Sequence, residues 1–153
     1  MPSKAEILRP YVESVVREYL EIPEGGELQK DDDGDIPIRW GSAIYYVRLI
    51  DRDPVLVRVF SVVLRGVELS HELLQELNET NQNVVSARVF WADGDIVASL
   101  ELPAETLDAG DFSYAAWAVG SLADWADTEL QPRFGGEKML EDEQGDDGTS
   151  VDV

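Results

Sequence analysis

The side chains best suited to chemistry in this chain are a single histidine, an aspartate-rich stretch and an abundance of carboxylates. His71 directly follows Ser70, a residue type that commonly caps helices, so we expect its imidazole in a first helical turn, facing solvent. No serine–histidine or metal–histidine constellation can be assembled around it. The chain has no cysteine, which excludes disulfides, thiolate zinc sites and cysteine nucleophiles.

The aspartate-rich stretch, residues 31–35, has the residue types of a calcium loop. An EF-hand places a glycine at its sixth position and a bidentate glutamate at its twelfth. Counted from Asp31, these positions hold Ile36 and Ser42 instead. The stretch therefore predicts a solvated turn, with weak divalent-ion binding as the alternative.

The carboxylates carry no specific catalytic signal. Paired acids perform proton transfer and glycoside hydrolysis. Among 32 acidic residues, however, some pair will lie close together in any fold. Neither glycine-rich phosphate-binding motif, G-x-x-x-x-G-K or G-x-G-x-x-G, is present. We therefore expect a chain without catalytic residues, cofactor or metal site, the alternative being a small enzyme or ligand sensor with a carboxylate-lined pocket.

The charge of the chain excludes one class of partner. The net charge is −20 and the isoelectric point is about 4.1. Nucleic acids are polyanions that require a basic surface, so they are excluded as partners. Charged residues and Pro10 interrupt the apolar positions near the N-terminus, and no stretch approaches the length of a membrane span. We expect a cytoplasmic protein without a membrane partner.

The elements that would position any site follow from the hydrophobic periodicity. It predicts an α+β fold of order α-β-β-β-α-β-β-α, in which helices cover mainly one face of an antiparallel sheet. Ser3 and Glu6 predict a capped first helix that reaches Leu20, with Pro10 either inside it or opening a second helical piece. The other expected elements are strands at 36–40, 43–50 and 55–65, a helix after Ser70, strands at 84–91 and 96–102, and a helix at about 111–130.

The end of the chain differs in composition from the rest. From Glu137 onward it holds seven acids against Lys138 and few apolar residues. Such a composition is typical of disordered segments. We therefore expect one domain over residues 1–134 and an acidic, disordered tail over residues 135–153.

The two faces of the predicted strands differ. Alternation along each strand gives one almost wholly apolar face, formed by Tyr45, Val47, Leu49, Val55, Val57, Val59, Val63, Ala87, Val89, Ile96, Ala98, Leu100 and Leu102. The other face mixes apolar and aromatic groups with arginines: Ile44, Tyr46, Arg48, Ile50, Leu56, Arg58, Phe60, Val62, Leu64, Ser86, Arg88, Phe90, Val97, Ser99 and Glu101.

This second face has a composition typical of protein interfaces. A half-solvated sheet normally carries polar residues there, whereas aromatic groups and arginine are enriched where proteins meet. The sequence predicts a peptide-binding surface formed by Tyr46, Arg48, Arg58, Phe60, Val62, Arg88 and Phe90. Coverage by another helix or by a second copy of the chain is the alternative.

The last predicted helix carries aromatic residues away from its apolar stripe. These are Tyr114, Trp117 and, at its edge, Trp125. Such residues form either a second buried face or a contact surface, so we expect them at a dimer or other protein contact.

The order of these elements resembles the YbjN family, which is grouped with type III secretion chaperones. The resemblance covers roughly residues 2–134 and depends on three segments. They are Leu-Leu-Gln-Glu-Leu-Asn-Glu-Thr-Asn at 73–81, Leu-Glu-Leu-Pro at 100–103 and Leu-Ala-Asp-Trp-Ala-Asp at 122–127. It implies a type III secretion chaperone-like fold, frequent dimers and capture of extended segments of client proteins, without cofactor or catalytic residues.

We therefore expect a non-enzymatic chaperone or adaptor that binds a client polypeptide on its arginine-bearing sheet face. A homodimer without a client remains an alternative. A further hypothesis is that the acidic segment 137–147 lies over the arginines and competes with acidic clients, against a tail that only maintains solubility.

Overall fold

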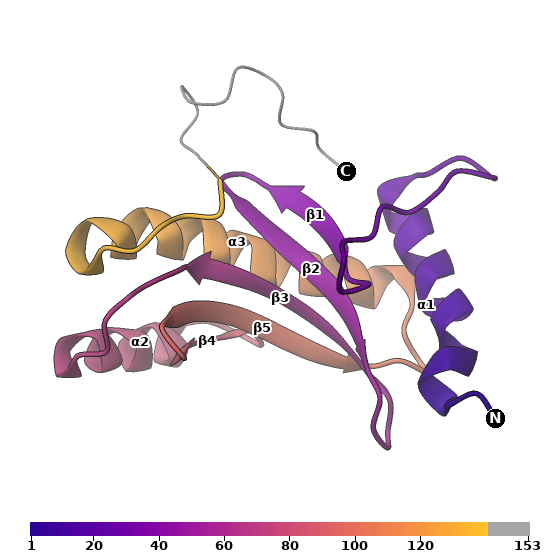
Figure 1. Ribbon diagram of the computed structural model, residues 1–153, viewed down its shortest axis with the longest axis horizontal. Helices are drawn as coiled ribbons and strands as arrows, with labels where there is room; N and C mark the ends of the chain where they lie inside the picture. Colours follow the sequence, from indigo (N-terminus) through magenta and orange to yellow (C-terminus); the bar gives the residue numbers. More distant parts are fainter. Residues whose placement is uncertain (141–153) are drawn as a thin grey trace.

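A computed structural model describes residues 1–140 of the chain as three helices and a five-stranded antiparallel sheet (Figure 1). The strand order is β1-β2-β3-β5-β4. The predicted α+β order is confirmed: α1 (Lys4–Leu20), β1 (Ile36–Trp40), β2 (Ala43–Ile50), β3 (Leu56–Leu64), α2 (His71–Asn83), β4 (Arg88–Ala92), β5 (Asp95–Pro103) and α3 (Ala109–Phe134). None of the helices in this range is both long enough and apolar enough to span a bilayer.

Helix α1 is continuous, so the alternative of two helical pieces is wrong. The Ser3 hydroxyl oxygen accepts a hydrogen bond from the Glu6 backbone N–H at 3.2 Å, which caps the first turn as predicted. Pro10 lies inside the helix. The apolar side of α1 packs on α3, where Tyr19 meets Phe112 edge to face at 5.1 Å.

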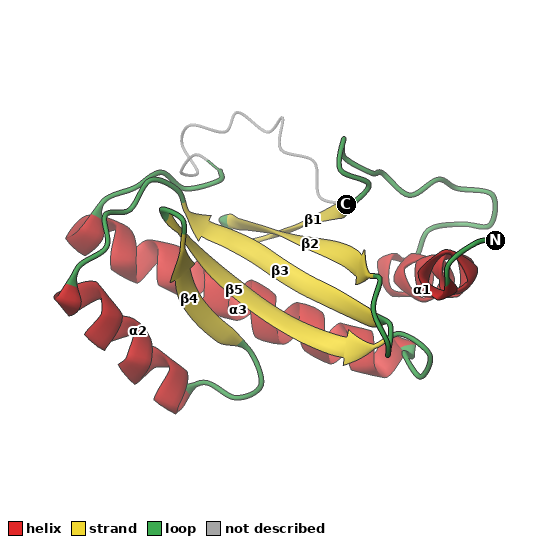
Figure 2. Ribbon diagram, turned by 60° about the horizontal axis from the view of Figure 1, so that its bottom comes forward, coloured by secondary structure: helices red, strands yellow, loops and turns green. Residues whose placement is uncertain are grey.

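The core lies between the sheet and α3, and most of its strand residues are those that the alternation predicts. Tyr45, Val57 and Val59 are fully buried on this side. Figure 2 shows α3 crossing behind the sheet, with α1 and α2 at opposite ends. Gly120 in the middle of α3 brings that helix close to the sheet, because a Cβ there would lie 2.5 Å from the Trp40 indole. Helices thus cover one face, which we call the inner face.

Strand β3 contains the one irregularity that changes the predicted faces. Its register with β5 shifts between Val62 and Leu64. Because a shift of one residue exchanges the two faces of a strand, Leu64 is fully buried, and its predicted place beside Phe60 was wrong.

The β4 region also differs from its prediction. The strand begins at Arg88, not at residue 84, because Val84 caps α2 and Ser86 has a positive φ of 74°. Ser86 therefore lies in a loop, not on the predicted strand face. Helix α3 extends a few residues beyond the predicted 111–130 at both ends.

Helix α2 closes the β4 edge of the sheet. Ser70 caps it as predicted, since its hydroxyl oxygen accepts a hydrogen bond from the Leu73 N–H at 3.0 Å. The Asn81 side chain accepts from the Val89 N–H and donates to the Val89 carbonyl, both at 2.8 Å. This amide takes the place that a neighbouring strand would occupy, so α2 is held beside β4.

The chain continues past α3 along the end of β3. Arg65 and Glu137 form an antiparallel bridge through two backbone hydrogen bonds of 2.9 and 2.8 Å. The remainder of the predicted acidic tail, residues 141–153, lies outside the described residues.

Candidate functional site

The face of the sheet opposite α3 carries no helix among the described residues (Figure 2). We call it the outer face. The strand pairing places all seven predicted peptide-binding residues on it: Tyr46 lies opposite Phe60, Arg48 opposite Arg58, and Val62 opposite Val97, which in turn pairs with Phe90. Arg88 faces Ser99 in the same layer. Most of these side chains are half-buried by one another.

One half of the outer face is an aromatic pair beneath a guanidinium. The Tyr46 and Phe60 rings stack with centroids 5.4 Å apart, and the Arg48 guanidinium lies 4.8 Å from the Phe60 centroid. Arg48 also donates two hydrogen bonds to Asp35, Nε to Oδ1 at 2.8 Å and Nη2 to Oδ2 at 2.6 Å. These hydrogen bonds raise the pKa of Arg48 above its usual value. The arginine is thus held over the Phe60 ring.

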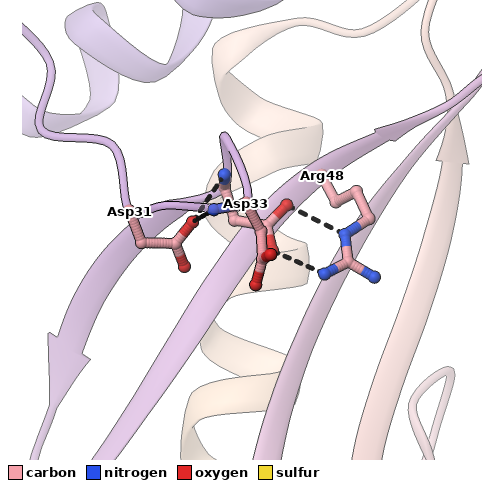
Figure 3. Close-up of polar contacts among 4 residues, drawn as sticks. Asp31, Asp33 and Arg48 are labelled. Carbon is pink, nitrogen blue, oxygen red and sulfur yellow. Dashed lines mark hydrogen bonds and ion pairs between the residues drawn. The ribbon is translucent and has the colours of Figure 1, made fainter.

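Figure 3 shows Asp31 and Asp33 in the turn that precedes β1, with Arg48 on β2. The same turn fixes the position of Asp35. The Asp31 carboxylate accepts hydrogen bonds from the backbone N–H groups of Asp33 and Asp35, at 2.9 and 3.0 Å. The predicted turn is therefore confirmed, but it is not solvated throughout, because Asp35 is buried. Asp31, Asp33 and Asp35 each bring one carboxylate oxygen within 4.8 Å of the others, as a cation site would require. Asp35 uses both oxygens to bind Arg48, however, so the arrangement serves the turn and the arginine.

The other half of the outer face is organised around Glu101. Its Oε2 accepts hydrogen bonds from the Ser99 hydroxyl at 2.6 Å, Arg58 Nε at 2.8 Å and Arg88 Nη2 at 3.3 Å. Burial acts to raise the pKa of Glu101, but the hydrogen bonds from Ser99 and Arg58, together with the two arginine charges, lower it below its usual value. The Arg88 guanidinium lies 5.2 Å from the Phe90 centroid.

The outer face is therefore less positive than the arginines alone indicate. Asp35 and Glu101 neutralise much of the charge of Arg48, Arg58 and Arg88. The arginine side chains remain 40%, 36% and 54% exposed, and each is held in place by a carboxylate. The sequence analysis did not predict the role of Asp35, because this residue lies outside β2, the strand whose Arg48 it binds. Its position directly before β1 could have indicated this role, because the antiparallel pairing of Ile36 with Val47 brings the preceding residue beside Arg48.

The predicted aromatic contact residues of α3 lie at a second surface, between α2 and α3. Trp117 and Trp125 line a cavity of about 560 Å³, together with Val85, Ala118, Leu122 and residues of α2. We call it the α2–α3 groove. Tyr114 lies just beyond the lining residues, with its ring 5.9 Å from that of Trp117.

A carboxylate-lined pocket would favour the enzyme alternative. Burial raises the pKa of Asp127, which is 2% exposed. The Ser42 hydroxyl lies 3.0 and 2.9 Å from the two Asp127 oxygens and 2.5 Å from Asp124 Oδ1. Asp35, the other buried acid among the described residues, lines the smaller cavity beside Arg48, but both of its carboxylate oxygens accept hydrogen bonds from that arginine. Asp127 lines neither this cavity nor the α2–α3 groove. This acid joins α3 to the β1–β2 turn.

Comparison with known proteins gives a single family. Residues 6–142 match the model of TY-Chap1, described as "T3SS (YopN, CesT) and YbjN peptide-binding chaperone 1". No curated protein sequence matches the chain.

Several solved structures share the fold. One is the crystal structure of the ExsC–ExsE complex, with a TM-score of 0.59 and 13% identity over 85% of this chain and 97% of that chain. Another is the HopA1–SchA chaperone–effector complex, with a TM-score of 0.60 and 10% identity over 80% of this chain and 97% of that chain.

Proposed function

Because the chain belongs to the TY-Chap1 family of type III secretion and YbjN peptide-binding chaperones, we propose that it binds segments of a client protein on its outer sheet face. The observation that carries this proposal is the aromatic and arginine-bearing face that no helix covers in the described part of the chain. We propose a non-enzymatic role in the cytoplasm, with a client polypeptide as the partner.

The organisation of the outer face supports binding of an extended peptide. Aromatic rings and the carbon stems of arginines offer apolar contact, whereas the guanidinium edges offer hydrogen-bond donors to backbone carbonyls and acidic side chains. Asp35 and Glu101 hold the arginines before a client arrives. Side chains ordered in advance lose less conformational entropy on binding, which favours affinity.

The test uses short peptides selected from a random library on the full-length protein. We expect the selected peptides to combine apolar residues with an acidic residue. Replacing Phe60 and Arg58 together by serine removes one aromatic ring and one guanidinium from the centre of the face. The dissociation constants should rise at least about tenfold, as at interface hot spots.

The matched control replaces an exposed apolar residue and an exposed arginine elsewhere, Ile7 and Arg52, by serine. Circular dichroism must show both variants folded. Equal peptide affinity in the two variants would contradict the assignment of the face. A dimer in sedimentation equilibrium that dissociates only in the Phe60/Arg58 variant would show that a second copy, and not a client, occupies this face.

A further inference from the structure

The α2–α3 groove exposes several large apolar side chains. Trp117 is 53% exposed, Trp125 is 45% exposed and Val85 is 72% exposed. Buried Ala118, Leu122 and Thr80 form its floor. Exposed clusters of large apolar side chains usually mark a contact with another molecule.

Two polar contacts between the walls define the length of the groove. At one end Arg133 Nη1 donates to Glu76 Oε1 at 2.6 Å, which joins the end of α3 to α2. At the other end the Ser86 and Tyr114 hydroxyls are 2.7 Å apart, which joins the loop after α2 to α3. Between these contacts, Trp117 and Trp125 are two helical turns apart on α3, or about 12 Å. The groove thus fits about two turns of a partner helix.

The wall formed by α2 is acidic. Its sequence, His-Glu-Leu-Leu-Gln-Glu-Leu-Asn-Glu-Thr-Asn-Gln-Asn, holds three glutamates and neither lysine nor arginine. Glu76 and Glu79 line the groove, and Glu76 is engaged by Arg133. An occupant with basic residues would therefore meet carboxylates on one wall. The two indoles on the other wall also attract lysine and arginine through their ring faces.

We infer that the α2–α3 groove binds a basic amphipathic helix of a partner protein, with its apolar side on Trp117 and Trp125 and its lysine or arginine residues toward Glu79. The charge complementarity selects this occupant. The chain's own acidic segment 141–153 has the same sign as α2. A second copy seated symmetrically on the groove would oppose α2 carboxylates to one another. This site is separate from the proposed client face and, unlike that charge-balanced face, has an acidic wall.

The experiment measures binding of a synthetic amphipathic helix of leucine and lysine to the full-length protein, with tryptophan fluorescence as the signal. Two reference peptides are its leucine–glutamate counterpart and a scrambled peptide of the same leucine–lysine composition. We expect the leucine–lysine helix to bind at least about tenfold more tightly than either reference. The glutamate counterpart meets like charges, and the scrambled peptide has no apolar side.

Four variants test where the peptide binds. Trp117→Ala should weaken binding at least about tenfold, since exposed tryptophans are frequent hot spots. Glu79→Lys should weaken it several-fold, with the difference from the unsubstituted protein fading as salt rises. Glu24→Lys, which makes the same charge change in the exposed loop after α1, should have little effect. The Phe60/Arg58 variant should bind this peptide normally, so failure of the client face and failure of the groove can be told apart.

Three results would overturn the inference. One is equal binding of the scrambled peptide, which would indicate attraction to the net charge alone. Another is an equal loss in Glu24→Lys and Glu79→Lys. The third is a dimer in sedimentation equilibrium that Trp117→Ala dissociates, since the groove would then hold a second copy of the chain.

Discussion

The outer sheet face and the α2–α3 groove are both apolar surfaces flanked by charge, but they hold their charges differently. On the outer face Arg48, Arg58 and Arg88 are each joined to a carboxylate, and Arg48 and Arg88 also lie over aromatic rings. At the groove, α2 contributes Glu76 and Glu79 and neither lysine nor arginine, and only Glu76 is paired, with Arg133 of α3. One surface is charge-balanced and ordered by ion pairs, and the other is acidic.

This difference shows how one small domain can present two surfaces with different preferences. A charge-balanced face is expected to depend mainly on apolar contact and backbone hydrogen bonds, and so to tolerate many client sequences. An acidic groove is expected to discriminate by charge and to respond strongly to salt. Helix α3 connects the two, because one side of it packs under the sheet and the other side lines the groove.

The largest expected effect follows from this shared helix. In Gly120→Ala the new Cβ would lie 2.5 and 2.6 Å from two carbons of the Trp40 indole, so the indole or α3 must move. We expect a loss of about 2 kcal/mol in the free energy of unfolding, although alanine is a better helix former than glycine by about 1 kcal/mol. Urea unfolding measures the loss, and both surfaces should bind their peptides more weakly.

Gly110→Ala is the control for this prediction. It makes the same substitution in the first turn of α3, where the new Cβ would meet only Asp108 Oδ1 at 3.5 Å. We expect no loss of stability there. Equal stability of the two variants would show that close packing of α3 on Trp40 is not required.

A smaller effect, confined to the outer face, is expected from Glu101→Gln. The amide accepts hydrogen bonds more weakly than the carboxylate from Arg58, Arg88 and Ser99. We expect a loss of about 1.5 kcal/mol at neutral pH. Because the folded-state pKa of Glu101 is lowered, its stabilisation is present above the unfolded pKa, near 4.3, and is lost as pH falls through the folded value.

Urea unfolding at neutral pH and in acid tests this sign. The two proteins should converge in acid, and binding of the leucine–lysine helix at the groove should stay unchanged at neutral pH. Glu105→Gln is the control, since its pair with Lys4 is more than half exposed and contributes little. A loss that is constant with pH would contradict an ionic role for Glu101.

Much of the outer face could be predicted from the sequence because strand alternation is a local property. The two-residue period assigned Tyr46, Phe60 and Arg58 to one side, and the register confirms this. The same reasoning failed for Leu64. The register shift lies within the apolar segment Val62-Val63-Leu64, where no change of residue type along the sequence indicates it. The same reasoning also missed Asp35, whose role depends on a pairing between β1 and β2.

The groove could be predicted only in part, for a related reason. The position of Trp117 and Trp125 away from the apolar stripe of their helix indicated a contact surface. Its opposite wall, however, depends on where α2 lies, and that is decided by the hydrogen bonds between Asn81 and Val89. Such a contact is set by tertiary packing, which the periodicity of either helix does not report.

The smallest expected effect is a gain in stability, in Asp127→Asn, at a residue that takes no part in either binding surface. Burial raises the folded-state pKa of Asp127, so the folded state gains stability from its protonation. That contribution is fully present below the unfolded pKa, near 3.9, and is lost as pH rises through the folded value. Asp127→Asn keeps a side chain that can accept from Ser42 without a buried charge, and should therefore stabilise the protein by about 1 kcal/mol at neutral pH.

The gain should shrink toward zero in acid, as should the loss in Glu101→Gln, although the two effects have opposite signs at neutral pH. Glu129→Gln, at an exposed position on the same helix, is the control and should leave stability unchanged at both pH values. Since Asp127 lies at neither surface, its variant should bind both the selected peptides and the leucine–lysine helix normally. If binding at either surface changed with this substitution, the two surfaces would be coupled through α3 rather than independent.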